Sequence, residues 1–253
     1  MCQVNQPPPP LHLRALATDF DGTLAHNGTV SETALRALER WKRAGNKLIL
    51  VTGRELNDLA AIFPELGWFD LAVMENGAVL FHPATQTTEA LAEPPPSEFV
   101  ARLHERGLPL QLGRVIVATW EPHETEVLDA IKDFGIEYQV IFNKGAVMIL
   151  PSGVNKAFGL RVALKQLDLE PAEVAGIGDA ENDHAFLDIC GLSVAVANAL
   201  PAIKEKVQII TRGDHGDGVV ELIERLLPAA EAAKTAATAN PELEQVDSGG
   251  GSS

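Results

Sequence analysis

Short, almost continuously apolar runs alternate with helix-like segments along most of this chain, and this alternation limits the fold more than any other feature. The runs 48–51 (LILV) and 192–196 (LSVAV) are the clearest examples. A strand of a parallel sheet is covered by helices on both faces, so it lacks the polar–apolar alternation of a half-exposed strand. We therefore predict an α/β fold, a Rossmann-like parallel sheet flanked by helices. The predicted strands are 13–18, 48–52, 71–74, 174–177, 192–196 and 208–211, and Ser31 is expected to cap a helix over 31–44.

The segment 83–151 interrupts this rhythm. Its pattern predicts helices at 97–107 and 124–134, a strand at 114–119, and strands at 138–142 and 146–150 joined by a tight turn at Asn143–Gly145. We interpret 83–151 as a small α+β cap domain, inserted into a catalytic core that consists of 11–82 and 152–227. Residues 1–10 are expected to form an N-terminal tail, and the Ala-rich, then Gly/Ser-rich segment 228–253 a disordered C-terminal tail.

The charge balance argues against several classes of partner. The 253 residues carry 35 Asp and Glu against 20 Lys and Arg, a net charge of −15, so no nucleic-acid partner is expected. No apolar stretch approaches the roughly 20 residues of a membrane-spanning helix, and the N-terminus does not resemble a secretory signal. Cys2 and Cys190 do not form a disulfide framework, and Cys190 is expected in the core. We expect a cytoplasmic protein without a membrane partner, whose oligomeric state the sequence leaves open.

Two polar segments follow predicted strands in the N-terminal half. Asp19 and Asp21 lie two residues apart at the end of the first strand, which costs energy unless a cation or a proton lies between them. Gly22 frees the backbone to approach an anion. Thr52 ends the second strand before Gly53, where a hydroxyl can bind one phosphoryl oxygen. Each pattern also has a plain explanation, a polar turn for the acids and helix capping for Thr52.

Two further polar segments lie in the C-terminal half. Lys156 stands at the predicted N-terminus of a helix, where a cation opposes the helix dipole unless an anion is held nearby. Asp179 and Asp183 are four residues apart, on one face if a helix starts there, and hard oxygen donors of this kind suit Mg²⁺. A solvated Lys156 and an N-capping Asp179 are the plain alternatives. Because ligands bind at the carboxyl edge of a doubly wound sheet, we expect all four segments to meet there.

In this order the four segments resemble the motifs of the haloacid dehalogenase (HAD) superfamily of phosphohydrolases. The matching residues are DFDGT at 19–23, Thr52 after an apolar strand, Lys156, and GDAEND at 178–183. The resemblance covers about 13–227. The insertion after the second motif, with ENGA at 75–78 and ANA at 197–199, is similar to the Cof-type branch, subfamily IIB. That branch carries an α/β cap and includes phosphoglycolate and sugar-phosphate phosphatases.

The resemblance implies a Mg²⁺-dependent phosphomonoester hydrolase that acts on a small phosphorylated metabolite through an aspartyl-phosphate intermediate. It implies Asp19 as the nucleophile and Asp21 as the general acid and base. It also implies a metal site formed by Asp19, Asp21 through its backbone carbonyl, Asp179 and Asp183. The remaining implied residues bind the substrate phosphate (Thr52, Gly53, Lys156 and Gly22) or support the site (Asn182, Asn76 and Arg54).

Other functions stay open at this point. A phosphotransferase or phosphomutase would use the same residues and pass the phosphoryl group to a sugar hydroxyl. A phospho-accepting signalling module or a binding protein would use a similar acidic site without turnover. Within the insertion, the candidates for contact with the substrate's leaving group, each with a plain structural alternative, are Arg114, Trp120, His123, Glu124, Asn143 and Lys144.

Overall fold

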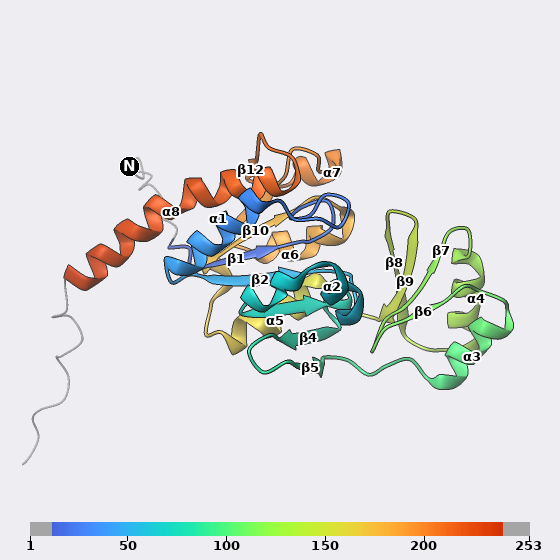
Figure 1. Cartoon of the computed structure of the whole chain (residues 1–253). Helices are drawn as coiled ribbons and strands as arrows, with labels where there is room; N and C mark the ends of the chain where they lie inside the picture. The colour runs from blue at the N-terminus through green and yellow to red at the C-terminus, as the bar shows by residue number, and fades with distance from the viewer. Residues whose placement is uncertain (1–11, 240–253) are drawn as a thin grey trace, which may run out of the picture.

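The computed structural model describes residues 12–239, and an eight-stranded sheet forms their centre (Figure 1). The strand order is β12-β11-β10-β1-β2-β3-β4-β5. The parallel strands are β1 (Ala15–Thr18), β2 (Lys47–Val51), β3 (Leu71–Met74), β10 (Val174–Gly178), β11 (Leu192–Ala195) and β12 (Ile209–Ile210). Antiparallel pairs add β4 (Val79–His82) and β5 (Thr87–Ala90) at one edge. The predicted α/β class and its central parallel sheet are confirmed.

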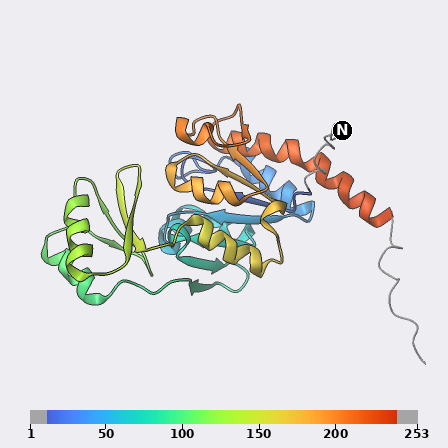
Figure 2. The ribbon, with the colours of Figure 1, turned by 180° about the vertical axis from the view of Figure 1, so that it is seen from behind.

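Helices cover both faces of this sheet. On one face α1 (Glu32–Arg43) packs against α8 (His215–Ala239), and on the other α5 (Lys156–Gln166) packs against α6 (His184–Ile189). Figure 1 is seen from the α1 side, and Figure 2 shows α5 and α6 from behind. The β1–α1–β2 and β10–α6–β11 connections run in opposite directions along the sheet, so right-handed crossovers place α1 and α6 on opposite faces. The shorter helical elements are α2 (Leu56–Ile62), α7 (Pro201–Lys204), η1 (Pro64–Trp68), η2 (Glu75–Gly77), η3 (Pro171–Glu173) and η4 (Glu181–Asp183).

The sequence of α1 explains its position. Ser31 caps the helix as predicted, since its hydroxyl accepts a hydrogen bond from the backbone nitrogen of Ala34 at 3.2 Å. Leu38 and Trp41 are fully buried on the inner face, and the Trp41 indole donates to the carbonyl oxygen of Lys47 at 2.9 Å. The apolar face of α1 therefore fixes the start of β2.

A second, antiparallel sheet forms a small module set to one side of the large sheet (Figure 2). We call residues 97–151 the small module. Its strand order is β6-β7-β9-β8, from β6 (Gln111–Leu112), β7 (Val117–Trp120), β8 (Tyr138–Asn143) and β9 (Ala146–Pro151). The helices α3 (Ser97–Glu105) and α4 (Glu124–Phe134) cover one face over a separate apolar core that includes Phe99, Leu103, Val117, Val127, Val147 and Ile149.

The opposite face of the small sheet is turned toward the large body. Side chains alternate along a strand. Val117 of β7 and Val147 of β9 therefore enter the module's own core, while Trp120 and Met148 line a cavity shared with the large body. The small module therefore forms one wall of this cavity, opposite the adjacent end of the large sheet.

The structure corrects the predicted boundaries in two places. We assigned Thr87–Ala90 to the insertion, but it pairs with β4 as the edge strand of the large sheet. Its sequence, TTEA, is mostly exposed and lacks the apolar signal of the central strands. We also assigned 228–239 to a disordered tail, but α8 continues to Ala239. Alanine has the strongest helix preference, so a segment that cannot form a core still forms a helix. The remaining predicted tails, 1–10 and 240–253, lie outside the described residues.

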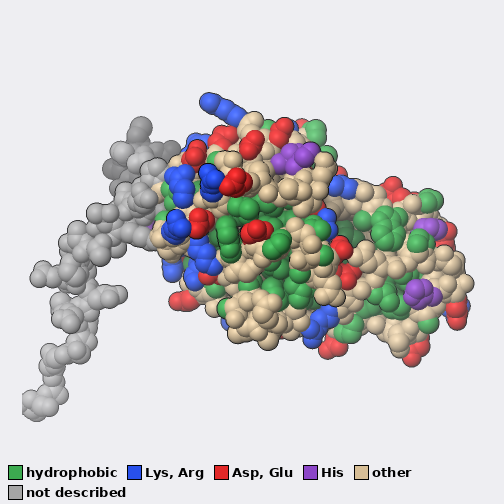
Figure 3. All heavy atoms as spheres, in the orientation of Figure 1, with side chains coloured by type: hydrophobic (Ala, Val, Ile, Leu, Met, Phe, Trp, Pro, Cys, Tyr) green, Lys and Arg blue, Asp and Glu red, His purple; other side chains and the backbone are tan. Residues whose placement is uncertain are grey.

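The surface carries mixed charge. On the face shown in Figure 3, Lys and Arg side chains lie among Asp and Glu side chains. Exposed ion pairs include Arg43–Glu39 and Arg40–Glu224, with N–O distances of 2.6 and 3.6 Å. Within residues 12–239, the helices are all too short or too polar to cross a membrane.

Candidate active site

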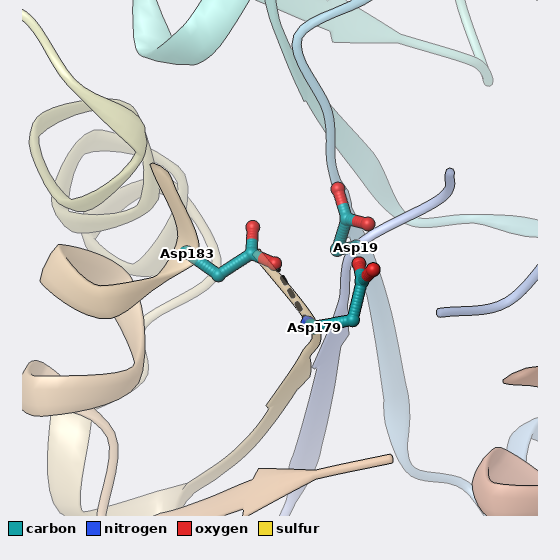
Figure 4. Close-up of side chains that lie close together, drawn as sticks. All are labelled: Asp19, Asp179 and Asp183. Carbon is teal, nitrogen blue, oxygen red and sulfur yellow. Dashed lines mark hydrogen bonds between the residues drawn. The ribbon is translucent and has the colours of Figure 1, made fainter. Parts of the chain in front are cut away.

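Three carboxylates from the segments that follow two neighbouring strands meet at the carboxyl edge of the large sheet (Figure 4). Asp19 follows β1 and Asp179 follows β10, and the two strands pair in parallel. Asp183 ends the short helix η4 that comes next. One oxygen from each of the three side chains lies within 4.8 Å of the others. The sheet topology thus joins acids that are about 160 residues apart in sequence.

Lys156 lies between two of these acids. It occupies the first position of α5, is only 2% exposed, and donates to Asp19 Oδ1 at 2.6 Å and to Asp183 Oδ1 at 2.5 Å. Burial alone would lower the pKa of Lys156, but the carboxylates of Asp183 and Asp19 outweigh it and raise that pKa. The carboxylates of Asp19 and Asp183 are therefore the anions that offset the unfavourable helix dipole at Lys156.

Asp183 holds the loop that carries Asp179. Its side chain is fully buried, and its Oδ2 accepts hydrogen bonds from the backbone nitrogens of Asp179 at 2.8 Å and Ala180 at 2.9 Å. A Cβ on Gly178 would lie 2.7 Å from that oxygen, so only glycine fits there. With Lys156 on its other oxygen, Asp183 is fully engaged.

The concentration of negative charge affects the protonation of Asp19. Burial and the carboxylate of Asp183 raise the pKa of Asp19 to about 8, although Lys156 opposes the shift. Burial and Asp183 also raise the pKa of Asp179. A divalent cation would favour the ionised form of both groups, and carboxylate oxygens are the ligands that Mg²⁺ prefers. The donor set therefore fits such an ion.

The carboxylate of Asp21 is not part of this three-acid cluster. Its carboxylate forms a bidentate ion pair with Arg54, with Nε–Oδ2 and Nη2–Oδ1 distances of 2.6 and 2.8 Å. Arg54 also contacts Asp58 at 3.3 Å and lies over the ring of Phe20. The backbone carbonyl of Asp21 points the other way and accepts from Lys144 Nζ at 2.8 Å. Asp21 thus offers its carbonyl and its carboxylate to different partners.

Thr52 and Gly53 form the turn after β2. The buried Thr52 hydroxyl accepts a hydrogen bond from the backbone nitrogen of Arg54 at 3.1 Å. Helix α2 begins only at Leu56, with Glu55 as its N-cap residue, so Thr52 does not cap it. A Cβ on Gly53 would lie 3.2 Å from Asn76 Oδ1, which leaves little room beside Thr52.

Asn76 and Asn182 link the core to the small module. Asn182 Nδ2 donates to Asn76 Oδ1 at 3.0 Å, and Asn76 Nδ2 contacts Met148 Sδ of β9 at 2.9 Å. The other amide oxygen, Asn182 Oδ1, is buried and has no hydrogen-bond partner among the described residues. Since a buried acceptor needs a donor, this atom indicates a place for one.

A cavity of about 240 Å³ opens beside this cluster, between the large body and the small module. Asp19, Asp21 and Lys156 lie on its floor, and Arg54, Glu55 and Asp58 on its core side. The module contributes its open sheet face to the opposite wall, with Gln111, Ile116, Ala118, Trp120, Asn143, Ala146 and Met148. Carboxylate and cationic groups thus line one small, partly open cavity.

A family model of haloacid dehalogenase-like hydrolases matches residues 16–112 and 111–223, which is most of the chain. The chain belongs to this family of hydrolases. The predicted resemblance to a HAD superfamily phosphatase is thereby confirmed, as is the prediction that the protein is an enzyme.

Individual relatives of this HAD hydrolase are phosphatases. A phosphoglycolate phosphatase of Methanothermobacter thermautotrophicus is 31% identical over 226 residues, which cover 85% of this chain and 99% of the relative. Phosphoglycolate phosphatase 2 of Saccharolobus solfataricus is 28% identical and covers 84% and 91% of the two chains. A haloacid dehalogenase-like hydrolase from Bacteroides thetaiotaomicron shares the fold, with a TM-score of 0.71 at 19% identity and coverage of 85% and 99%.

The candidate residues of the HAD hydrolase's small module divide into two groups. Trp120 and Asn143 line the cavity, and Lys144 donates to Asp179 Oδ2 at 3.2 Å. Arg114 instead binds the side chain and carbonyl of Thr88 on β5. His123 and Glu124, at the start of α4, do not line the cavity.

The sequence did not reveal the role of Glu75 in this HAD hydrolase. Glu75 is buried, and its carboxylate accepts three backbone hydrogen bonds from the module, from Arg114 at 2.9 Å, Val115 at 2.8 Å and Ile116 at 2.9 Å. The ENGA segment contributed to the resemblance, but no local pattern shows that its acid reaches 40 residues along the chain. Glu75 ties the core to the strand that carries Trp120.

Two further residues hold the DFDGT loop. Thr23 Oγ1 donates to Asp179 Oδ1 at 3.0 Å, and Asn198 Nδ2 donates to the carbonyl of Gly22 at 2.8 Å. Gly22 has φ 94°, and a Cβ there would lie 2.4 Å from Asp179 Oδ2. Thr23 and Asn198 belong to the DFDGT and ANA segments that resemble the family's motifs, but sequence spacing alone assigns no role to either.

Proposed function

We propose that this HAD hydrolase is a divalent-cation-dependent phosphomonoesterase that acts on a small phosphorylated metabolite, of which 2-phosphoglycolate is the leading candidate. The observation that carries the proposal is that Asp19 and Lys156 line a cavity of about 240 Å³ while Asp179 and Asp183 lie against them. Acids alone could serve capping or packing, whereas a potential nucleophile, a buried cation and a small cavity together fit phosphoryl transfer.

Asp19 is the proposed nucleophile. One carboxylate oxygen would attack phosphorus in line and form an acyl phosphate while the phosphorus–oxygen bond to the leaving group breaks. Lys156, which contacts Asp19 Oδ1, would neutralise charge on the non-transferred phosphoryl oxygens as well as on Asp19. Thr52, Gly53 and Gly22 are the proposed further contacts of the phosphoryl group.

Asp21 is the proposed general acid and base. It would give a proton to the departing oxygen and later take one from the water that attacks phosphorus, so that the bond to Asp19 breaks and inorganic phosphate leaves. Its bidentate pair with Arg54 supports this role in one respect, because it fixes the carboxylate at the cavity wall. Proton transfer then requires the pair to loosen when the substrate binds.

A divalent cation, Mg²⁺ in our proposal, would be held by Asp19, Asp179 and the carbonyl of Asp21, with Asp183 positioning the loop. When bound, it supplies charge neutralisation for the phosphoryl group. Asn182 also lines the cavity. Its Oδ1, which has no hydrogen-bond partner among residues 12–239, could accept a hydrogen bond from a water molecule or a hydroxyl group there.

Cavity size and charge support a small anionic substrate. Arg54 lines the cavity and supplies positive charge there for a second anionic group beyond the phosphate. The relatives from Methanothermobacter and Saccharolobus are named phosphoglycolate phosphatases, and they match along almost their whole length.

The test is phosphate release by the purified protein from a panel of phosphorylated metabolites with Mg²⁺. We expect the highest kcat/KM for a two- or three-carbon phosphate that carries a carboxylate, complete loss of turnover with EDTA, and a loss of at least about a thousandfold for Asp19→Asn. Unchanged turnover of Asp19→Asn would refute the nucleophile. A preference for hexose phosphates would refute the substrate class and leave the reaction intact.

A further inference from the structure

Lys144 stands at the tip of the β8–β9 hairpin of the small module. The hairpin closes through Lys144 and Gly145, with φ values of 50° and 84°. Positive φ at both central positions is the mark of a type I′ turn, the tightest connection between two strands. The tight turn therefore fixes the position of the Lys144 backbone at the tip of the hairpin.

The Lys144 ammonium contacts two oxygens of the proposed cation site. Nζ donates to the backbone carbonyl of Asp21 at 2.8 Å and to Asp179 Oδ2 at 3.2 Å. A Cβ on Gly22, between these two residues in space, would lie only 2.6 Å from Nζ. One positive charge already takes the position from which a cation would reach both oxygens.

The two lysines at the acidic cluster differ in how easily they can leave. Lys156 is 2% exposed and is held by Asp19 and Asp183, so it is a fixed part of the core. The Lys144 side chain is 53% exposed and comes from a different part of the fold. Ion pairs with an exposed partner contribute little stability. Of the two lysines, Lys144 is therefore the one that a divalent cation can displace.

We propose that Lys144 and the divalent cation compete for the Asp21 carbonyl and the Asp179 carboxylate, so that cation binding detaches the hairpin tip from the core. The inference rests on the cation site of the proposed function. An ammonium and a divalent ion repel each other and cannot share two oxygens at this distance. The small module is held against the acidic cluster until the cation takes over these ligands.

Magnesium binding measured by calorimetry, without any substrate, tests the competition. Lys144→Met removes the charge and keeps the side-chain length, and Lys144→Asn removes the charge with a residue that tolerates positive φ. Both should bind Mg²⁺ about three- to tenfold more tightly than the wild type, since the ammonium occupies the ligands for most of the time. Lys144→Arg should stay close to the wild type. Lys132→Met, an exposed lysine on α4 of the same module, is the matched control and should not change the affinity.

A second readout follows the hairpin itself. Saturating Mg²⁺ should speed amide hydrogen exchange at 143–145 in the wild type and have a smaller effect in Lys144→Asn. Unchanged or weaker Mg²⁺ affinity in both neutral variants would overturn the competition, as would absence of Mg²⁺ binding in every variant. Neither assay uses turnover, so a failure of the phosphatase assay with normal Mg²⁺ competition would count against the proposed reaction alone.

Discussion

At the scale of single residues, the site depends on acids that the fold holds closer together than they would lie in water. Burial and neighbouring charge disfavour the ionised form of Asp19, and Lys156 compensates only in part. Buried charges contribute little to stability, so stability alone does not account for this cluster, which apolar residues could replace. The cluster is therefore best explained by chemistry.

The raised pKa of Asp19 predicts a pH-dependent stability of the cation-free protein. The folded state holds a proton on Asp19 up to about pH 8, whereas the unfolded carboxyl releases it near 3.8. Stability should therefore fall as pH rises between these two values and level off above the higher one. Thermal melts across this range with EDTA measure the slope. Asp19→Asn should flatten it, and an equally steep fall in that variant would contradict the assignment.

Lys156 predicts a large cost when one partner of a buried cluster is removed. Lys156→Met leaves Asp19 and Asp183 without their buried cation and should destabilise the protein by about 3 kcal/mol. Denaturant unfolding measures the loss. Lys165→Met, on the exposed side of the same helix, should change stability by less than about 0.5 kcal/mol. Similar effects of the two substitutions would show that Lys156 is not held as described.

At the scale of elements, η2 connects the large sheet to the small module. Glu75 and Asn76 both have positive φ, 50° and 53°, where non-glycine residues are uncommon. This turn allows the Glu75 carboxylate to accept hydrogen bonds from three backbone nitrogens of the module. It also allows Asn76 to contact Met148 and Asn182. The strained turn aims two side chains across the junction.

Glu75→Gln should loosen this junction. An amide offers one acceptor oxygen without charge in place of a carboxylate that accepts three bonds, so a loss of about 2 kcal/mol is expected. Amide exchange at Val115 and Ile116 should speed up at least tenfold, while the amides of β1 stay protected. Glu105→Gln, an exposed acid at the end of α3, serves as the control. Unchanged exchange at 115–116 would remove Glu75 from the junction.

The sequence predicted the elements whose signal is local. The apolar runs identified the six parallel strands, and the tight turn at 143–145 between two strand-like runs identified β8 and β9. The edge strand β5 was missed because its side chains are exposed and polar, and α8 was predicted too short because its Ala-rich composition was interpreted as disorder.

The four motif segments were expected at one sheet edge, and Asp19, Lys156, Asp179 and Asp183 do lie there in contact. The bidentate pairing of Asp21 with Arg54 and the reach of Glu75 were beyond prediction, because long-range side-chain contacts leave no mark in spacing.

At the scale of the whole molecule, the small module sets the size of the cavity. Its open sheet face supplies much of one wall, so the substrate must fit between the core and the small sheet. Closure of such a module over a phosphoryl-transfer site excludes water from the reaction.

Trp120 predicts a test of this size limit. Trp120→Ala should enlarge the cavity and reduce the ratio of kcat/KM for a two-carbon phosphate to that for a hexose phosphate by about tenfold or more. Steady-state kinetics with both substrates measures the ratio. Trp68→Ala, on the large body and outside the cavity lining, should leave it unchanged. An unaltered ratio in Trp120→Ala would mean that the module does not select by size.

The central claim is that Asp19 carries the phosphoryl group between the two steps, and trapping that group tests it most directly. Wild-type protein would be mixed with its best substrate, labelled with radioactive phosphorus, in the presence of Mg²⁺ and quenched in acid within milliseconds. We predict a protein-bound label that hydroxylamine removes and that Asp19→Asn abolishes. A label that persists in Asp19→Asn, or turnover without any labelled protein, would contradict the claim.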